Sequence, residues 1–293
     1  MVNVHIVTDS GAHFASAQFL QQHPVTVVPN KLTLNGKIYR EGVDLSPEEA
    51  LRLIGSQEKA PVVTVPTAAD YAEIYGRLAR DYDAIISIHA SREIYPSWQH
   101  ARVAAQQMVG SCQVAVIDSQ TVDAAQGILV GAAARAIKQE TTFDDMVRVA
   151  RGAVDRLYSI YYVETLEFLL QNQIMTPAHT ILGTMLGIKP FVTIEDGKLM
   201  PIEKVKTRGQ AVERLVEFAV EFTEEEIEDV LILQHRTAIT EQTRGLQDRL
   251  AVEFPERRFS HTIYGATLGA LIGADAAGMV ILERETDEPD DDF

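Results

Sequence analysis

The stretch Ile6-Val7-Thr8-Asp9-Ser10 decides the fold, because a short apolar run ends there in a carboxylate and a hydroxyl. Two later runs end in a similar way, since residues 84–89 (AIISIH) precede Ala90-Ser91 and residues 114–117 (VAVI) precede Asp118-Ser119. Such runs are typical of buried strands in a parallel sheet, whose carboxyl ends form a ligand-binding crevice. We therefore expect a polar strand-end site that comprises Asp9, Ser10, Asp118 and Ser119.

Strands alternate with helices as far as about residue 155. Asn35-Gly36 is a hairpin signal between extended stretches at 24–34 and 37–39. Ser46 and Thr67 each have the pattern of a helix N-cap with an acidic partner three residues later. Further strands are the three runs above, and further helices are expected near 13–22, 97–109 and 122–138. This alternation predicts a parallel sheet with right-handed crossovers.

The pattern changes after about residue 155. Asp196-Gly197 is a second hairpin signal. Strands are expected at 157–163, 190–193, 199–205, 230–233 and 279–282. Helices are expected near 165–171, 177–187, 208–221 and 239–252. The fold class is therefore α/β with two domains: a three-layer parallel α/β domain over 1–155, which carries the strand-end site, and a smaller α+β domain over 156–293.

Composition excludes several classes of function. The chain has 293 residues and a net charge of -16, so nucleic acid and anionic membrane surfaces would repel it. One cysteine, Cys112, excludes an internal disulfide framework. No apolar stretch approaches the roughly 20 residues that cross a bilayer. The first residues read as a strand and not as a signal peptide, so we expect a cytoplasmic protein without stable membrane insertion.

The motifs of common catalytic sites are missing from the sequence. It has no zinc signature, no Walker loop, no G-x-G-x-x-G after a strand and no G-x-S-x-G elbow, so no cofactor or metal is expected. Ser10, Ser91 and Ser119 would be nucleophiles only beside a base. His89 is the nearest by chain position, although a buried strand histidine fits it better. Asp9 and Asp118 fit either a metal pair or ordinary turn caps.

A lipid site fits the pattern better than a catalytic one. Hydroxyls at a strand end beside a helix N-terminus form a natural receptor for a polar head group. A hydrophobic tail would then need an apolar tunnel in the second domain. The side chains that could line it, each of which also fits an ordinary core, are Leu166, Phe168, Leu169, Leu170, Ile174, Met175, Ile181, Leu182, Met185 and Leu186.

Several segments together carry a family resemblance. Thr8-Asp9-Ser10 resembles an opening T-D-S, and Asp118-Ser119 a second strand-end D-S. Residues 39–46 (YREGVDLS) resemble a Y-x-D-G-x-D-I-S motif, residues 64–67 (TVPT) resemble S-Q-P-S, and residues 164–169 (ETLEFL) resemble D-T-L-E-Y-L. Later in the chain, residues 187–190 (GIKP) resemble N-I-K-P, residues 196–197 match D-G, and residues 206–208 (KTR) resemble R-T-R. In order and spacing they resemble the DegV family, bacterial fatty-acid-binding proteins that present acyl chains to a fatty acid kinase.

The resemblance implies a two-domain carrier, not an enzyme, with a long-chain fatty acid buried between the domains. A fatty acid kinase subunit is the implied partner and would supply the ATP chemistry. The carboxylate would be held by hydroxyls near the S-Q-P-S loop, by a serine at a helix N-terminus and by a histidine near the C-terminal end. The corresponding head-group set here is Thr64, Thr67, Ser91, Tyr95, Ser97 and Asp275.

This chain departs from the family pattern at that head group. Tyr95 stands in place of the serine, Asp275 in place of the histidine, and Ile174 in place of an arginine. An ionised Asp275 beside a carboxylate would cost affinity unless one group were protonated. Pro96 also removes an amide donor from the helix start. The site therefore binds fatty acid through a rearranged set such as Thr64, Tyr95 and Ser97, or prefers a neutral or cationic head, or is occluded.

Two hypotheses of function follow. The first is a lipid-binding carrier with a long, dry tunnel and no turnover. The second is a small-molecule enzyme, or a binder of a non-acid ligand, that uses Asp9, Asp118 and Asp275; it requires an open cleft with the carboxylates within mutual reach. A monomer is the default oligomeric state.

Overall fold

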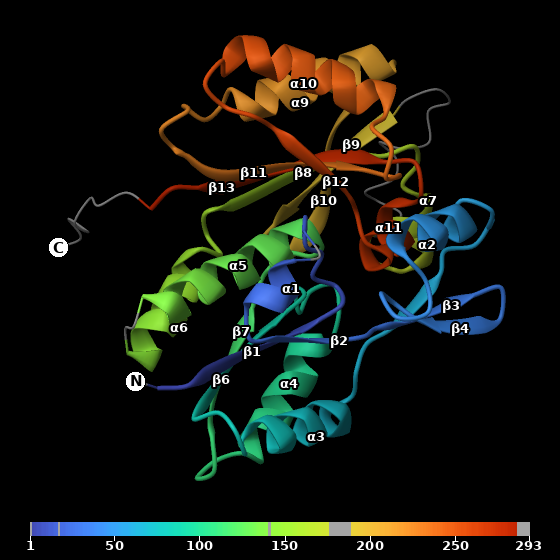
Figure 1. Ribbon diagram of the computed structural model, residues 1–293. Coiled ribbons are helices and arrows are strands. Elements are labelled where there is room, and N and C mark those ends of the chain that lie inside the picture. Colours follow the sequence, from blue (N-terminus) through green and yellow to red (C-terminus); the bar gives the residue numbers. More distant parts are fainter. Residues whose placement is uncertain (1, 17, 140–141, 176–188, 286–293) are drawn as a thin grey trace.

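The computed structural model describes residues 2–16, 18–139, 142–175 and 189–285 (Figure 1). The strands that decide the fold form a four-stranded sheet in the order β2-β1-β6-β7, in which every neighbouring pair is parallel. Their bounds are β1 (Val4–Asp9), β2 (Val25–Val28), β6 (Ala84–His89) and β7 (Gln113–Asp118). The predicted parallel sheet is confirmed.

Helices cover both faces of this sheet, because the strands alternate apolar side chains between two cores. On one face Val7 and Ile85 pack with Tyr71 and Tyr75 of α3 (Ala68–Leu78) and with α4 (Ser97–Gln106). On the other face Ile6 and Ile86 belong to a core shared with α5 (Ala124–Lys138) and α6 (Phe143–Gly152). We call this three-layer arrangement the parallel unit.

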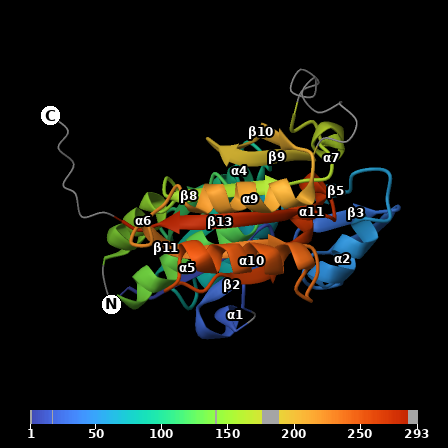
Figure 2. The same ribbon diagram turned by 90° about the horizontal axis from the view of Figure 1, so that it is seen from above.

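A second sheet has six strands in the order β10-β9-β8-β13-β11-β12, and all its pairs are antiparallel except β11 with β12. Its strands are β8 (Leu157–Tyr162), β9 (Lys189–Glu195), β10 (Lys198–Val205), β11 (Ile227–Gln234), β12 (Ser260–Ile263) and β13 (Ala277–Glu283). Helices α9 (Arg208–Ala219) and α10 (Glu241–Glu253) lie across its outer face (Figure 2). We call this sheet with α9 and α10 the mixed unit.

Helix α5 joins the two units. It contacts β1 and β6 of the parallel sheet and also β8, β11 and β13 of the mixed sheet, and Figure 1 shows it between them. Most of its residues are small, and they are buried almost all the way round, from Ala124 to Ala136. A helix that is apolar on every side is stable only when both faces are covered. The two sheets therefore share one continuous core through α5.

A smaller group of elements lies at one side of both units (Figure 1). An antiparallel sheet in the order β4-β3-β5 is formed by β3 (Lys31–Leu34), β4 (Lys37–Arg40) and β5 (Val62–Thr64). Helix α11 (Ala266–Ile272) packs against α2 (Pro47–Ile54), α7 (Glu167–Gln171) and β5. Residues from both ends of the chain are thus brought together beside the edge of the parallel sheet.

The helix caps and the hairpin turn that the sequence predicts are present in the structure. The Ser46 hydroxyl accepts a hydrogen bond from the Glu49 amide while the Glu49 carboxylate accepts one from the Ser46 amide, and Thr67 with Asp70 repeats this capping box. Asn35 and Gly36 have φ of 49° and 76°, as a tight hairpin requires. Both helix starts and the hairpin are therefore confirmed.

Other expectations differ from the structure. The helix expected near 13–22 is only α1 (Phe19–Gln22), because the His13 amide donates to the Asp123 carbonyl and so leaves the helical pattern. Helices α6 and α11 and strands β5 and β12 were not expected. The helix expected near 177–187 lies outside the described residues, together with Ile181, Leu182, Met185 and Leu186. In the described ranges, no helix combines the length and apolarity that a bilayer span needs.

Candidate functional site

The four predicted strand-end residues lie at the carboxyl edge of the parallel sheet but have different partners. Asp9 Oδ2 lies 2.9 Å from Nδ1 of His89, and both side chains are fully buried. Asp118 lies two strands away from Asp9 and accepts the amides of Arg92 and Gln120 at 3.2 and 3.1 Å. The Ser119 hydroxyl donates to the Thr121 carbonyl at 3.1 Å. Asp9 is therefore a core residue, whereas Asp118 and Ser119 stabilise a turn.

A chain of buried polar groups continues from Asp9. His89 Nε2 lies 2.7 Å from the Ser87 hydroxyl, which lies 2.6 Å from the Tyr75 hydroxyl. The order carboxylate, imidazole, hydroxyl is that of a hydrolase triad. Ser87, however, is fully buried in β6 and faces α3, so a substrate cannot reach its hydroxyl. The chain instead satisfies polar groups inside the core, which confirms that His89 is a buried strand histidine.

Ser10 leads to a second cluster on the other side of Asp9. Its hydroxyl donates to Glu41 Oε2 at 2.7 Å and accepts the Asn30 amide at 2.8 Å. Glu41 also accepts the amide and the hydroxyl of Thr267 at 2.7 and 2.5 Å. Burial raises the pKa of Glu41 to about 7 despite these donors. Glu41 lay in the segment that resembles Y-x-D-G, but the sequence reasoning gave it no role.

Asp123 is a second buried carboxyl that the sequence reasoning missed. It precedes α5 with a φ of 65°, and its Oδ1 accepts the Gly265 amide at 2.6 Å. Burial raises its pKa to about 7. Its other oxygen, Oδ2, is buried without a hydrogen-bond partner in the described part of the chain. A Cβ at position 265 would lie 2.9 Å from Asp123 Oδ1 and 3.4 Å from Glu41 Oε1, so glycine allows this close approach.

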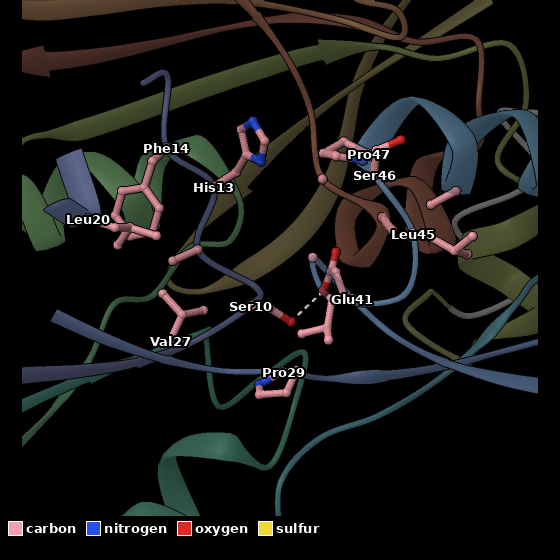
Figure 3. A pocket seen from close by; sticks show the side chains of 16 residues that line it. Ser10, His13, Phe14, Leu20, Val27, Pro29, Glu41, Leu45, Ser46 and Pro47 are labelled. Carbon is pink, nitrogen blue, oxygen red and sulfur yellow. Dashed lines mark hydrogen bonds between the residues drawn. The ribbon is translucent and has the colours of Figure 1, made fainter. Parts of the chain in front are cut away.

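A cavity of about 410 Å³ opens beside this cluster. Figure 3 shows the Ser10 and Glu41 side chains joined by a hydrogen bond within it, with His13 and Ser46 further out. Its walls are mainly apolar and come from the loops after β1, β2 and β4 and from the start of α2. The apolar side chains labelled there are Phe14, Leu20, Val27, Pro29, Leu45 and Pro47.

Three of the predicted head-group residues lie in the core near the junction of the units. The Tyr95 hydroxyl donates to the Thr267 carbonyl at 3.3 Å, and burial raises the pKa of Tyr95 above its usual range. The Ser91 hydroxyl donates to the Gly197 carbonyl at 2.7 Å, in the turn between β9 and β10. Ser97 is buried at the start of α4, after Pro96. Tyr95 and Ser91 thus join the parallel unit to elements that come late in the chain.

The other three predicted head-group residues lie on accessible surface or cap a helix. Thr64 is exposed at the end of β5, and Thr67 caps α3. The Asp275 side chain is 52% exposed, and its carboxylate lies 3.0 Å from Arg208 and 3.5 Å from His235. Arg208 also pairs with Glu164 at 3.4 Å. Asp275 therefore has a cationic partner of its own, which sequence reasoning did not foresee.

An apolar cluster lies between the parallel unit, α7 and α11. All its members belong to one continuous hydrophobic core. We define this interface cluster as Val65, Ile94, Tyr95, Leu166, Leu169, Met175, Leu268, Leu271 and Ile272. Phe168, Leu170 and Ile174 are partly buried and pack against the same core. All six described members of the predicted tail-lining set therefore belong to this hydrophobic core or pack against it.

No group of three or more His, Cys, Asp or Glu side chains in the described ranges is arranged to hold a metal ion. The arrangement instead combines a buried polar cluster, built on Glu41, Thr267 and Asp123, with the interface cluster. Tyr95 belongs to both, because its ring lies in the apolar cluster and its hydroxyl bonds Thr267. Such a juxtaposition of polar and apolar surface suits an amphiphilic ligand.

Known proteins are similar to this chain in sequence and in fold. A DegV domain-containing protein of Streptomyces coelicolor is 30% identical over 96% of this chain and 99% of its own length. The fatty acid binding DegV family protein of Streptococcus agalactiae superposes with a TM-score of 0.87 at 21% identity, covering 97% of this chain and 100% of that one.

Two further solved structures have the same fold. DegV of Bacillus subtilis, described as a fatty acid binding protein, has a TM-score of 0.85 at 24% identity, with 97% and 100% of the two chains covered. A Eubacterium eligens relative loaded with heptadecanoic acid has a TM-score of 0.81 at 14% identity, with 96% and 100% covered. The family model described as "Uncharacterised protein, DegV family" matches residues 3–284. The chain therefore belongs to the DegV family.

Proposed function

We propose that this protein binds a long-chain fatty acid or a related lipid in a buried tunnel between its two predicted domains, residues 1–155 and 156–293, and acts as a carrier. The observation that carries the proposal is the interface cluster, a continuous apolar region that meets a buried hydroxyl at Tyr95. The solved relatives from Streptococcus agalactiae and Eubacterium eligens, described as fatty acid binding and as loaded with heptadecanoic acid, support it.

An apolar tail supplies most of the binding free energy in such a site. Each buried methylene contributes about 0.8 kcal/mol, so only a long chain gains enough to bind tightly through its tail. The α7 segment offers Leu166 and Leu169 to that tail, and α11 offers Leu268. Short acids such as butyrate are therefore poor ligands on this proposal.

The head-group set stays as proposed from the sequence: Thr64, Thr67, Ser91, Tyr95, Ser97 and Asp275. Asp275 forms an ion pair with Arg208, and this neighbouring cation offsets the negative charge that Asp275 would present to a ligand carboxylate. The ion pair therefore supports the proposal that the head-group set tolerates an acid. Tyr95 would donate its hydroxyl to the ligand in place of the Thr267 carbonyl. This exchange keeps one hydrogen bond to a buried phenol in both states.

The proposal has further parts that concern the domains, the location and the partner of the protein. The chain divides into domains near residue 155, it works in the cytoplasm without catalytic turnover, and it presents its acyl ligand to a fatty acid kinase subunit. The enzyme alternative has less support, since Asp9, Asp118 and Asp275 have separate partners in His89, Arg92 and Arg208. An acid–base mechanism would need at least two of these carboxylates at one substrate.

Substitutions of opposite charge at position 174 test whether the ligand head group is a carboxylate. Ile174 is partly buried beside the interface cluster and stands where the family pattern has an arginine. We expect Ile174→Arg to bind stearate several-fold more tightly than the delipidated parent protein, and Ile174→Glu several-fold more weakly, by titration calorimetry. Both variants bury a charge on the same backbone, so each controls for the other. Equal effects of the two charges, or equal binding of butyrate and stearate, would contradict the proposal.

A further inference from the structure

The 410 Å³ cavity beside Glu41 is not used by the proposed lipid site (Figure 3). Among the described residues, its lining includes neither Tyr95 nor any other residue of the proposed head-group set, and no member of the interface cluster. It is bounded instead by the loop after β1, the end of β2, the start of α2 and Gly265 before α11. A hollow of this size, walled by Phe14, Val27 and Leu45, accepts a small organic molecule.

The polar surface of the cavity consists mainly of hydrogen-bond acceptors. Glu41 lines it, and within the described ranges its Oε1 accepts a single hydrogen bond, from the Thr267 amide, which leaves a lone pair for a ligand. The Ser10 hydroxyl already uses its hydrogen in the hydrogen bond that it donates to Glu41 Oε2, so it can only accept from a ligand. Burial lowers the pKa of His13 to about 4, so this ring is neutral at pH 7. In the part of the chain that the structure describes, neither lysine nor arginine lines the cavity.

A second carboxyl strengthens the negative potential at the same place. Asp123 lies directly behind Gly265, and its Oδ2 is buried with no partner among the described residues. Its proximity is one of the influences that raise the pKa of Glu41. A cation near both groups would be attracted more strongly than in water, because the surrounding core has a low effective dielectric constant.

We propose that this cavity binds a small organic amine as its ammonium ion, with the ammonium on Glu41 and the apolar body against Phe14, Val27 and Leu45. The ammonium donates to Glu41 Oε1, which supplies the free acceptor. The apolar body displaces water from the walls. An alcohol of the same shape binds more weakly because it lacks the positive charge. A carboxylate of the same shape is repelled because it carries the same charge as Glu41.

The protonation of Glu41 makes this proposal measurable in the unmodified protein. Glu41 has a pKa of about 7 and is surrounded by Ser10, Thr267, Asp123 and the ring of Tyr95. An ammonium ion binds the ionised carboxylate, so binding near pH 6.5 releases a proton from the protein. The apparent affinity therefore rises between pH 6 and pH 8.

The test is titration calorimetry with 2-phenylethylamine, 2-phenylethanol and 3-phenylpropanoate. We expect the amine to bind at least tenfold more tightly than the alcohol at pH 7.5, and the acid not to bind. Buffers of different ionisation enthalpy should report proton release at pH 6.5. Absence of heat with millimolar amine, equal affinity for amine and alcohol, or no proton release would overturn the proposal.

Two variants locate the amine. Glu41→Gln keeps the shape of the side chain and should lose the preference for amine over alcohol, whereas Glu93→Gln, an exposed carboxyl outside the cavity, should keep it. Saturation with stearate separates this site from the proposed lipid site and should leave the amine affinity unchanged. Amine binding that survives Glu41→Gln, or that stearate abolishes, would place the amine elsewhere and overturn the proposal.

Discussion

The Glu41 carboxylate accepts both the amide and the hydroxyl of Thr267, at 2.7 and 2.5 Å, although 226 residues separate the two in the chain. Asp123 makes a similar contact with the Gly265 amide at 2.6 Å. Two buried carboxyls from the first half of the chain thus hold the start of α11, which contributes Leu268, Leu271 and Ile272 to the interface cluster. The stability of this junction is therefore linked to their protonation.

The first prediction concerns pH. Burial raises the pKa of Glu41 from 4.5 to about 7, so the native state keeps a proton that the unfolded chain has lost between these values. The native state binds more protons there, so the free energy of unfolding falls as pH rises from about 4.5 to 7. Glu41→Gln removes this titration. As pH rises from 5 to 8, the free energy of unfolding of the variant should therefore increase by up to roughly 3 kcal/mol relative to that of the parent protein.

Urea denaturation at pH 5, 6.5 and 8 measures this change. Asp123 remains in the variant, and its pKa of about 7 should leave a smaller fall in stability over the same range. Glu93→Gln is the control, because its exposed carboxyl should leave the pH profile of the parent unchanged. A parallel shift of the Glu41→Gln curve, with no change of slope, would show that Glu41 does not titrate in this range.

The second prediction concerns the contact between Ser91 and the turn at Gly197. Gly36 and Gly197 have nearly the same φ, 76° and 78°, but a Cβ at 197 would lie 2.5 Å from the Ser91 hydroxyl, while one at 36 meets nothing within 4 Å in the described structure. Gly36→Ala should lose about 1–2 kcal/mol of unfolding free energy from backbone strain. Gly197→Ala should lose about 1–2 kcal/mol more, because it adds a steric clash.

A double variant separates the clash from the strain. Ser91→Ala removes the hydroxyl that the new Cβ would meet, so it should restore part of the stability that Gly197→Ala loses. By itself Ser91→Ala should cost about 1 kcal/mol, since the Gly197 carbonyl loses its donor. Strictly additive losses in denaturant titrations would mean that the two side chains do not meet.

The fold could be predicted where a signal was local. The apolar run that ends at Asp9 predicted β1, and the capping residues Ser46 and Thr67 predicted α2 and α3. Helix α6 has an equally good local signal, since Thr142 caps it by accepting the Asp145 amide. The loop at His13 could not be predicted, because its amide bonds to Asp123, more than 100 residues later.

The site was harder to predict than the fold. Asp9 and Ser10 are adjacent, and successive side chains along an extended chain point to opposite sides, so they meet different clusters. Asp9 meets His89, whereas Ser10 meets Glu41. The other partner of Glu41, Thr267, comes from α11, near the other end of the chain. No periodicity or spacing encodes such long-range pairs, and they depend on how the two sheets pack around α5.

The third prediction concerns the buried carboxylate at the end of β1. Asp9 accepts the Gly11 amide at 2.9 Å and lies 2.9 Å from the His89 ring, with no exposed surface. Asp9→Ala takes the carboxylate away from the buried Gly11 amide and from His89 Nδ1, although His89 Nε2 keeps the Ser87 hydroxyl. The loss should cost about 3–5 kcal/mol of unfolding free energy. Asp118→Ala is the control at the same sheet edge, where the carboxylate is partly exposed and pairs with Arg92, and should cost clearly less. Similar losses in chemical denaturation would contradict the core role of Asp9.

The fourth prediction concerns Asp275, which lies 3.0 Å from Arg208. Asp275→His removes a negative charge and one of the two carboxylates that pair with Arg208, so that Arg208 can interact more strongly with a ligand carboxylate. Stearate binding should therefore strengthen by about 3–10-fold, equivalent to about 1 kcal/mol. Asp248→His on α10 is the control, because it makes the same change of charge on an exposed helix position. Unchanged or weaker affinity in calorimetry would remove Asp275 from the head-group site.

The central claim is that the protein carries a long-chain acid between its two predicted domains. Native mass spectrometry of the purified protein, followed by solvent extraction and identification of the released molecule, tests it most directly. We predict one long-chain fatty acid per chain, held despite Tyr95 and Asp275 at the head group. An empty protein that also fails to take up stearate, or one that releases a ligand without a carboxylate, would contradict the account.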